Sequence, residues 1–184
     1  MQINKEERIF LIGYMGAGKT TIGEQLAERL EYNFLDMDYM IEEKIQQSVS
    51  QIFSELGEEK FRQLERECLE KISTERNVVV ATGGGAPCFY DNMERMNACG
   101  LTVYLNLSPE ELQERLELSH KNKRPLLAQR QGEELLNFIR KNLSEREPFY
   151  RKAAFVVSGT DEEMLQQILS FLRKDSFFDK RIVS

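Results

Sequence analysis

The chain has 184 residues, 41% of them hydrophobic, and a formal net charge of −6. This length and composition predict one globular domain, spanning residues 1–184, with a substantial buried core. The acidic balance argues against broad binding of nucleic acid or an anionic membrane, and no stretch approaches the roughly 18 apolar residues of a membrane-spanning helix. Three cysteines without a C-x-x-C spacing favour reduced thiols, so we expect a soluble cytoplasmic protein.

The first predicted strand, 9–12, leads into the motif G-x-x-x-x-G-K-[ST] at residues 13–20, and a helical pattern continues to about Leu30. The motif glycines let successive backbone N–H groups turn inward around a phosphate, and the helix N-terminus adds a positive field. Lys19 is placed to reach the β and γ phosphates, while the Thr20 hydroxyl suits Mg²⁺. These features predict a nucleoside triphosphate site at Gly13, Met15, Gly16, Ala17, Gly18, Lys19, Thr20 and Thr21.

The rest of the chain alternates between strand and helix patterns. In order, we expect a strand at 33–35, helices at about 39–46, 49–56 and 58–72, a strand at 78–82, a helix or turn at 91–97, a strand at 102–107, a helix from 109, a basic loop at 120–131, a helix at about 133–144, a strand at 154–157 and a helix from 160. Such alternation indicates an α/β fold, a three-layer α/β/α arrangement around a central five-stranded parallel sheet.

Ligands of such sheets gather at the carboxyl ends of the strands, where the phosphate loop, an acidic pair and a glycine triplet (83–85) are all predicted to lie. Asp36 and Asp38 are two residues apart, so they face the same way if both are extended. One of them, with Asp36 as the obvious candidate, is then suited to the Mg²⁺ ion and its water. The other is suited to meet an acceptor hydroxyl, as phosphoryl transfer requires.

Other classes of nucleotide-binding protein fit the sequence less well. A switch GTPase needs N-K-x-D and D-x-x-G motifs, but residues 122–125 read N-K-R-P and no aspartate has a glycine three residues later. A transport ATPase or helicase normally shows a strand ending in aspartate, whereas the strands at 78–82 and 102–107 end in T-G-G-G and N-L-S. A regulatory module that binds ATP without catalysis stays open as the alternative that is not an enzyme.

Six separated motifs together resemble the shikimate kinase family, and the resemblance covers nearly the whole chain. The motifs are the phosphate loop followed by I-G at 22–23, F-x-D-x-D at 34–38 with I-E at 41–42, G-E-x-x-F-R-x-x-E at 57–65, T-G-G-G at 82–85, R-P-L-L at 124–127 and R-x-P-x-Y at 146–150. The resemblance implies a nucleoside-monophosphate-kinase-like phosphate-loop fold. It also implies an enzyme that uses ATP and Mg²⁺ to phosphorylate the 3-hydroxyl of shikimate. Because no exposed apolar stripe is evident in the sequence, we expect a monomer.

The resemblance also implies roles for individual residues. Asp38 resembles the residue that orients, and deprotonates, the attacking hydroxyl, and Arg62 and Arg146 resemble the pair that grips the substrate carboxylate. Arg124 resembles a lid arginine that moves onto the transferring phosphate, next to the catalytic Lys19. The implied set is completed by Gly83, Gly84 and Gly85 against the substrate ring and by Thr20 and Asp36 as metal ligands.

The same resemblance divides the domain into a core at about 8–173, a substrate-binding region at about 36–65, a lid at about 117–131 and a tail at about 174–184. The family often has a further lid arginine before R-P-L-L, where this chain has only Lys121 and Lys123 as substitutes, and lysine lacks the bidentate fork. The lone histidine, His120, is expected to do no chemistry. Kinases of gluconate or of a nucleoside monophosphate remain the nearest alternative enzymes.

Overall fold

A computed structural model describes residues 8–118 and 130–174 of the chain. Within them, five parallel strands form one sheet in the order β2-β3-β1-β4-β5, which confirms the predicted fold class. The strands are β1 (Arg8–Ile12), β2 (Asn33–Asp36), β3 (Val78–Ala81), β4 (Leu101–Leu105) and β5 (Phe155–Val157).

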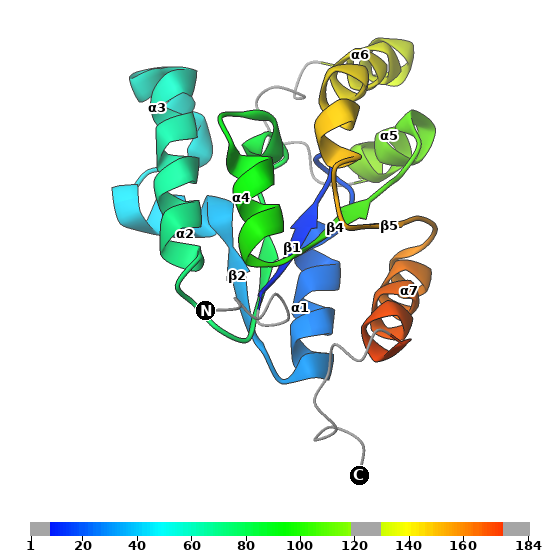
Figure 1. The fold of residues 1–184 in the computed structure, drawn as a ribbon. Coiled ribbons are helices and arrows are strands. Elements are labelled where there is room, and N and C mark those ends of the chain that lie inside the picture. Colours follow the sequence, from blue (N-terminus) through cyan, green and yellow to red (C-terminus); the bar gives the residue numbers. More distant parts are fainter. Residues whose placement is uncertain (1–7, 119–129, 175–184) are drawn as a thin grey trace.

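Helices cover both faces of this sheet (Figure 1). Because β1 to β2 and β3 to β4 step across the sheet in opposite directions, right-handed connections place their helices on opposite faces. Helix α7 packs beside α1, and α4 lies against β4. The helices are α1 (Lys19–Leu30), α2 (Met37–Ile45), α3 (Val49–Ile72), the short 3₁₀ helix η2 (Ala86–Cys88), α4 (Asn92–Cys99), α5 (Pro109–Leu118), α6 (Gly132–Tyr150) and α7 (Asp161–Lys174).

The core lies along the three central strands, in which every residue is buried. The uninterrupted run of apolar residues in β3 is therefore explained by helices on both sides of the sheet. The edge strands β2 and β5 are only partly buried. The central strands thus form a rigid support whose carboxyl ends carry the loops of the site.

Two helices, α3 and α6, test the helix boundaries that were predicted from the sequence. Gly57, with φ 81° and ψ 167°, interrupts α3 with non-helical backbone, as expected from two predicted helices that meet there. The first of them begins with a capping box between Ser48 and Gln51. The predicted end of α6 near Ser144 is wrong, because the helix continues through Pro148 to Tyr150.

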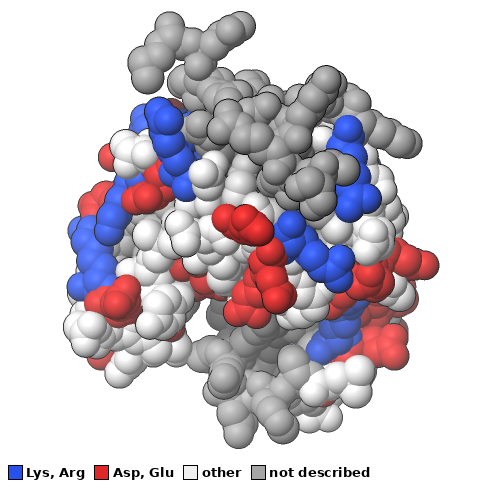
Figure 2. Space-filling view, turned by 90° about the horizontal axis from the view of Figure 1, so that it is seen from below, with Lys and Arg blue, Asp and Glu red and all other residues white. Residues whose placement is uncertain are grey.

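Several predictions fall outside the described residues: Arg124, Lys121, Lys123 and His120, most of the lid at 117–131, and the tail after Lys174. Within the described ranges, no helix is long and apolar enough to cross a membrane. On the face drawn in Figure 2, basic and acidic side chains lie interspersed. Exposed basic and acidic residues also pair in salt bridges, such as Lys44–Glu67 at 2.7 Å.

Candidate active site

The carboxyl ends of three neighbouring strands bring the site together. In the register of the sheet, Ala81 of β3 pairs with Leu11 of β1 on one side and with Asp36 of β2 on the other. The phosphate loop follows β1, Asp36 ends β2, and the glycine triplet follows β3. The three segments therefore leave the sheet side by side, as the sequence predicted.

The phosphate loop has the backbone that its glycines suggest. Gly13, Gly16 and Gly18 all have positive φ, and a Cβ on Gly13 would lie 2.9 Å from the carbonyl oxygen of Leu105. The Lys19 ammonium donates to the carbonyl oxygens of Gly13 and Tyr14 at 2.9 Å each, so its aliphatic stem spans the loop. Because α1 begins at Lys19 without a side-chain cap at Gly18, no capping side chain binds its first N–H groups, which suits an anion site.

The remaining members of the predicted nucleotide site differ in exposure. Met15, Gly16 and Gly18 are partly exposed at the surface of the loop. Ala17 is fully buried, so its contribution to a phosphate site is through its backbone rather than its methyl group. Thr21 is exposed on the first turn of α1.

Thr20 and Asp36 lie together beside the loop, in an arrangement that fits a magnesium site. The Thr20 hydroxyl donates to Oδ2 of Asp36 at 3.0 Å, which gives a pair of hard oxygen ligands. Mg²⁺ commonly takes one or two such ligands and completes its shell with waters and phosphate oxygens, so this donor set fits. Among the described residues no cluster of three His, Cys, Asp or Glu side chains offers a site made by protein alone.

The premise that Asp36 and Asp38 are both extended is wrong. Asp36 ends β2 in extended backbone, but Asp38 already belongs to the first turn of α2. Oδ1 of Asp36 accepts the backbone N–H groups of Asp38 and Tyr39 at 3.0 and 3.3 Å, which caps the helix. The cap starts α2 earlier than predicted and turns Asp38 towards the glycine triplet.

Asp38 meets Glu65 at Gly83. A Cβ on this glycine would lie 2.6 Å from Oε1 of Glu65 and 2.8 Å from Oδ1 of Asp38. Both oxygens are buried and have no hydrogen-bond partner in residues 8–118 and 130–174. Burial and the nearby Asp36 carboxylate raise the pKa of Asp38 to about 6, although Lys19 opposes the shift. Burial likewise raises the pKa of Glu65 to about 7 against the attraction of Arg62.

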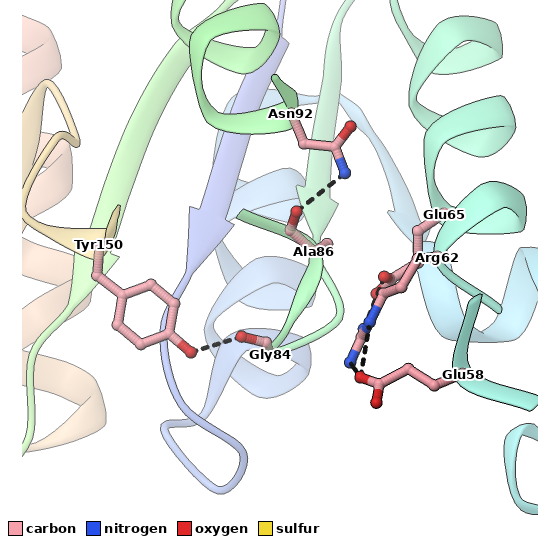
Figure 3. Close-up of polar contacts among 7 residues, drawn as sticks. All are labelled: Glu58, Arg62, Glu65, Gly84, Ala86, Asn92 and Tyr150. Atoms are coloured by element: carbon pink, nitrogen blue, oxygen red, sulfur yellow. Dashed lines mark hydrogen bonds and ion pairs between the residues drawn. The ribbon is translucent and has the colours of Figure 1, made fainter. Parts of the chain in front are cut away.

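Arg62 is buried, with the acids Glu58 and Glu65 beside its guanidinium (Figure 3) and three aromatic rings around it. Its Nη1 donates to Glu65 at 2.7 Å, and its Nη2 and Nε donate to Glu58 at 2.8 and 3.2 Å. A Cβ on Gly85 would lie 2.6 Å from Nη1, so the guanidinium lies directly against the glycine triplet. From its helix position alone, Arg62 would have been taken for a solvated surface charge.

Arg146 approaches the triplet from α6. Its Nη1 would lie 3.7 Å from a Cβ on Gly84, and its guanidinium lies 5.4 Å from the centre of the Tyr14 ring in the phosphate loop. The neighbouring Tyr150 hydroxyl donates to the carbonyl oxygen of Gly84 at 2.5 Å (Figure 3). Tyr150 thereby ties the helix that carries Arg146 to the glycine triplet.

The glycine triplet is therefore the meeting point of the predicted site. Gly83 contacts Asp38 and Glu65, and Gly85 contacts Arg62. A Cβ on Gly84 would lie 3.4 Å from the backbone nitrogen of Met15, which belongs to the phosphate loop. The structure thus brings together the loop, the carboxylate and both arginines, and only Arg124 lies outside the described residues.

Some residues of the site were given no role from the sequence. Glu58 and Glu65 flank Arg62 at helical spacings of four and three, which is the signal that was available. The pair Arg115–Asp161 borders the phosphate loop, since a Cβ on Gly18 would lie 3.2 and 3.1 Å from their polar atoms. That pair joins α5 to α7, and no local pattern in the sequence predicts it.

A phosphate loop beside a buried carboxylate and two arginines, on this sheet, defines a small-molecule kinase of the phosphate-loop class. The sequence model of the shikimate kinase family matches residues 15–175. A shikimate kinase of Parabacteroides distasonis is 53% identical over 161 residues, covering 88% of this chain and 91% of that protein. The chain belongs to the shikimate kinase family.

Solved structures agree with this assignment. A shikimate kinase from Bacteroides thetaiotaomicron has a TM-score of 0.86 at 44% identity, covering 91% of this chain and 98% of that chain. A shikimate kinase from Acinetobacter baumannii, solved in complex with shikimate, has a TM-score of 0.83 at 35% identity over 92% and 94% of the two chains. A gluconokinase from Sinorhizobium meliloti is only 18% identical, with a TM-score of 0.63, and shares the fold alone.

Proposed function

We propose that this protein transfers the γ-phosphoryl group of ATP to the 3-hydroxyl of shikimate, giving shikimate 3-phosphate and ADP. The observation that carries the proposal is the glycine triplet, which contacts the phosphate loop, the Asp38 carboxylate and Arg62 over three consecutive residues. A carboxylated ring alcohol laid against these glycines has a base for its hydroxyl and cations for its carboxylate within reach. A donor phosphate in the loop lies on the other side.

On the donor side, the loop amides and the N-terminus of α1 hold the phosphates, and Lys19 neutralises charge on them. Thr20 and Asp36 are the ligands proposed for Mg²⁺, which when bound draws negative charge from the β and γ phosphate oxygens. In the structure Lys19 donates to two loop carbonyls, which hold its ammonium group beside the loop. Such preorganisation avoids reorganisation during the transfer.

On the acceptor side, we assign the substrate carboxylate to Arg62 and Arg146, whose planar guanidinium groups suit two-point binding. Asp38 orients the attacking hydroxyl. Its Oδ1 is buried and without a partner among the described residues, so it is available to accept the hydroxyl hydrogen bond. As the new bond from oxygen to the γ phosphorus forms, the bond to the leaving ADP oxygen breaks and the hydroxyl proton passes to Asp38.

We further propose that the enzyme is one catalytic domain that works as a cytoplasmic monomer, with a lid at about 117–131 whose Arg124 completes the phosphate site. Closure of such a lid would exclude water, a competing phosphoryl acceptor. Cys68 and Cys99 are buried thiols and Cys88 is partly exposed, and all three are free, which suits a reducing compartment.

The experiment is a coupled assay of ADP release with ATP and Mg²⁺, comparing shikimate, quinate, gluconate and CMP as acceptors. We expect turnover with shikimate and much lower rates with the others, because gluconate has no ring, CMP has no carboxylate, and the saturated ring of quinate is less flat than that of shikimate. The phosphorylated position is then read from the NMR spectrum of the product.

Equal rates with gluconate or CMP would contradict the assignment of the acceptor. ADP release that is the same with and without any acceptor would favour a nucleotide-binding module with a weak ATPase over a kinase of shikimate. Phosphate on a hydroxyl other than the 3-hydroxyl would leave a shikimate-directed kinase but contradict the proposed orientation against Asp38.

A further inference from the structure

Two consecutive aromatic residues link the glycine triplet to α3. Phe89 and Tyr90 follow η2, and their rings stack on arginines of α3: the ring centre of Phe89 lies 4.1 Å from the guanidinium carbon of Arg62, and that of Tyr90 lies 5.3 Å from Arg66. Arg62 and Arg66 are four residues apart and thus lie on the same side of the helix. In both pairs a ring lies over a guanidinium, Phe89 more closely than Tyr90, but only Arg62 belongs to the proposed acceptor site.

The contacts of Arg62 leave a defined part of its guanidinium for a ligand. A guanidinium has five N–H donors, and three of them bind acceptors in the described part of the chain, one from Nε and one from each terminal nitrogen. One N–H on each terminal nitrogen remains, the number that a bidentate carboxylate needs. Glu58 and Glu65 bind the guanidinium through hydrogen bonds at its edges. Such bonds do not fix the tilt of the guanidinium plane, which depends on what packs against its two faces.

Phe89 is the aromatic ring that covers a face of this group at close range. The rings of Phe53 and Phe61 lie at 5.6 and 5.5 Å, clearly farther than the 4.1 Å of Phe89. The edge restraints differ in strength, because the Glu65 side chain is 1% exposed but that of Glu58 is 57% exposed. A carboxylate in water holds its partner weakly, so the stacked ring is the second firm restraint on the plane of the guanidinium.

We propose that Phe89 is a positioning residue for the acceptor, which fixes the plane of Arg62 so that its two remaining N–H groups face the substrate carboxylate. Gly85 and Phe89 belong to the same turn, so one loop both clears space for Arg62 and supports its face. The inference rests on the proposed function, since it needs a carboxylated acceptor at Arg62. It predicts that Phe89 governs acceptor binding and leaves the transfer step, which depends on Asp38 and Lys19, intact.

The test is Phe89→Leu, which removes the π face but retains an apolar side chain. We expect the KM for shikimate to rise about 5- to 30-fold, the range for loss of a partly desolvated cation–π contact, while kcat stays within about twofold. The KM for ATP should not change. Titration calorimetry of shikimate binding should show the same loss of affinity, independently of turnover.

Two variants serve as controls. Tyr90→Leu removes the adjacent ring from Arg66, outside the proposed site, and should leave the KM for shikimate unchanged. Phe89→Tyr retains a π face and should restore affinity to within about twofold of the original protein. Thermal unfolding of all three variants establishes that each is folded at the assay temperature.

A folded Phe89→Leu protein with unchanged shikimate KM and binding would overturn the inference while leaving the proposed function standing. An equal rise in KM for Tyr90→Leu would also overturn it, because the effect would then belong to the loop as a whole. An original protein that releases no ADP with shikimate is a distinct result, and it would overturn both the proposed function and the inference built on it.

Discussion

At the scale of single residues, the site leaves too little space at Gly83 for even one added methyl group. A methyl group on Gly83 would lie 2.6 Å from Glu65 and 2.8 Å from Asp38, closer than real Cβ contacts. Gly83 is not among the glycines with positive φ, so no left-handed backbone requires a glycine there. What excludes a side chain at this position is therefore the pair of buried carboxylates.

Gly83→Ala tests this constraint. Because Asp38 or Glu65 must shift to admit the methyl group, we expect kcat to fall about 100-fold and the free energy of unfolding to fall by about 1–3 kcal/mol. Steady-state kinetics and urea unfolding measure the two effects. In Gly84→Ala the nearest contact would be 3.4 Å, so that variant should lose less stability. Gly83→Ala with unaltered kcat and stability would show that the carboxylates are not fixed against the loop.

A residue of the site could be predicted from the sequence where the groups that it contacts are close to it in the chain. The phosphate loop is a contiguous motif, and its lysine and glycines were predicted with their roles. The acids beside Arg62 are marked by helical spacing, but burial, which makes Glu65 a firm partner, depends on what packs over the helix. The bond between Tyr150 and Gly84 joins residues 66 positions apart, and no periodicity within one element predicts it.

At the scale of elements, the kink at Gly57 sets the direction of the helical segment that carries Arg62. Its φ of 81° and ψ of 167° lie in a region that residues with a side chain hardly enter. A Cβ there would meet nothing within 4 Å, so crowding has no part in the constraint. The glycine allows one segment of α3 to end and the next to begin with Glu58, which contacts Arg62.

Gly57→Ala should therefore destabilise through the backbone alone. We expect the free energy of unfolding to fall by about 1–3 kcal/mol and the KM for the acceptor to rise, measured by urea unfolding and by kinetics. Gly132→Ala is the matched control: its φ of 52° is near the left-handed helical value and its Cβ also meets nothing. That variant should be clearly more stable than Gly57→Ala, and equal losses would remove the backbone explanation.

Helix boundaries followed from the sequence where the stop signal is local and failed where tertiary contacts decide. Gly57 was recognised as a stop because glycine alone tolerates the required dihedral angles. The end of α6 was predicted too early, near Ser144, whereas the helix continues through Pro148, a residue type that usually breaks a helix. Here the turn around Pro148 is held by Tyr150, which is fully buried and bonded to Gly84, and the helix continues to that anchor.

At the scale of the whole molecule, five parallel strands and two helical layers were predictable from alternating patterns, but the strand order was not. The order β2-β3-β1-β4-β5 depends on pairings between strands far apart in the chain. It places β3 between β1 and β2, so the glycine triplet lies between the phosphate loop and Asp36. The composition of the site was thus visible in the motifs, whereas its geometry comes from this order.

The meeting of these strand ends also affects the stability of the whole molecule, because the carboxylates of Asp38 and Glu65 are buried there. The pKa of Asp38 is raised to about 6 and that of Glu65 to about 7, chiefly by burial. A group whose pKa is higher in the folded than in the unfolded state makes its full contribution to stability below its unfolded pKa. That contribution is lost as the pH rises through the folded pKa. Both groups therefore lower the free energy of unfolding as the pH rises from about 4 to about 7.

Asp38→Asn should consequently separate activity from stability. Without its proton acceptor, kcat should fall by about 100- to 10,000-fold. The variant should nonetheless match the original protein in stability near pH 4 and exceed it by about 2 kcal/mol near pH 8, because a neutral amide carries no charge to desolvate. Urea unfolding across this pH range measures the difference.

Glu67→Gln is the control: Lys44 lowers the pKa of that exposed carboxyl, so no gain at high pH is expected. An Asp38→Asn protein no more stable than the original at pH 8 would show that the Asp38 charge costs the fold nothing, and one with undiminished kcat would remove Asp38 from the transfer step.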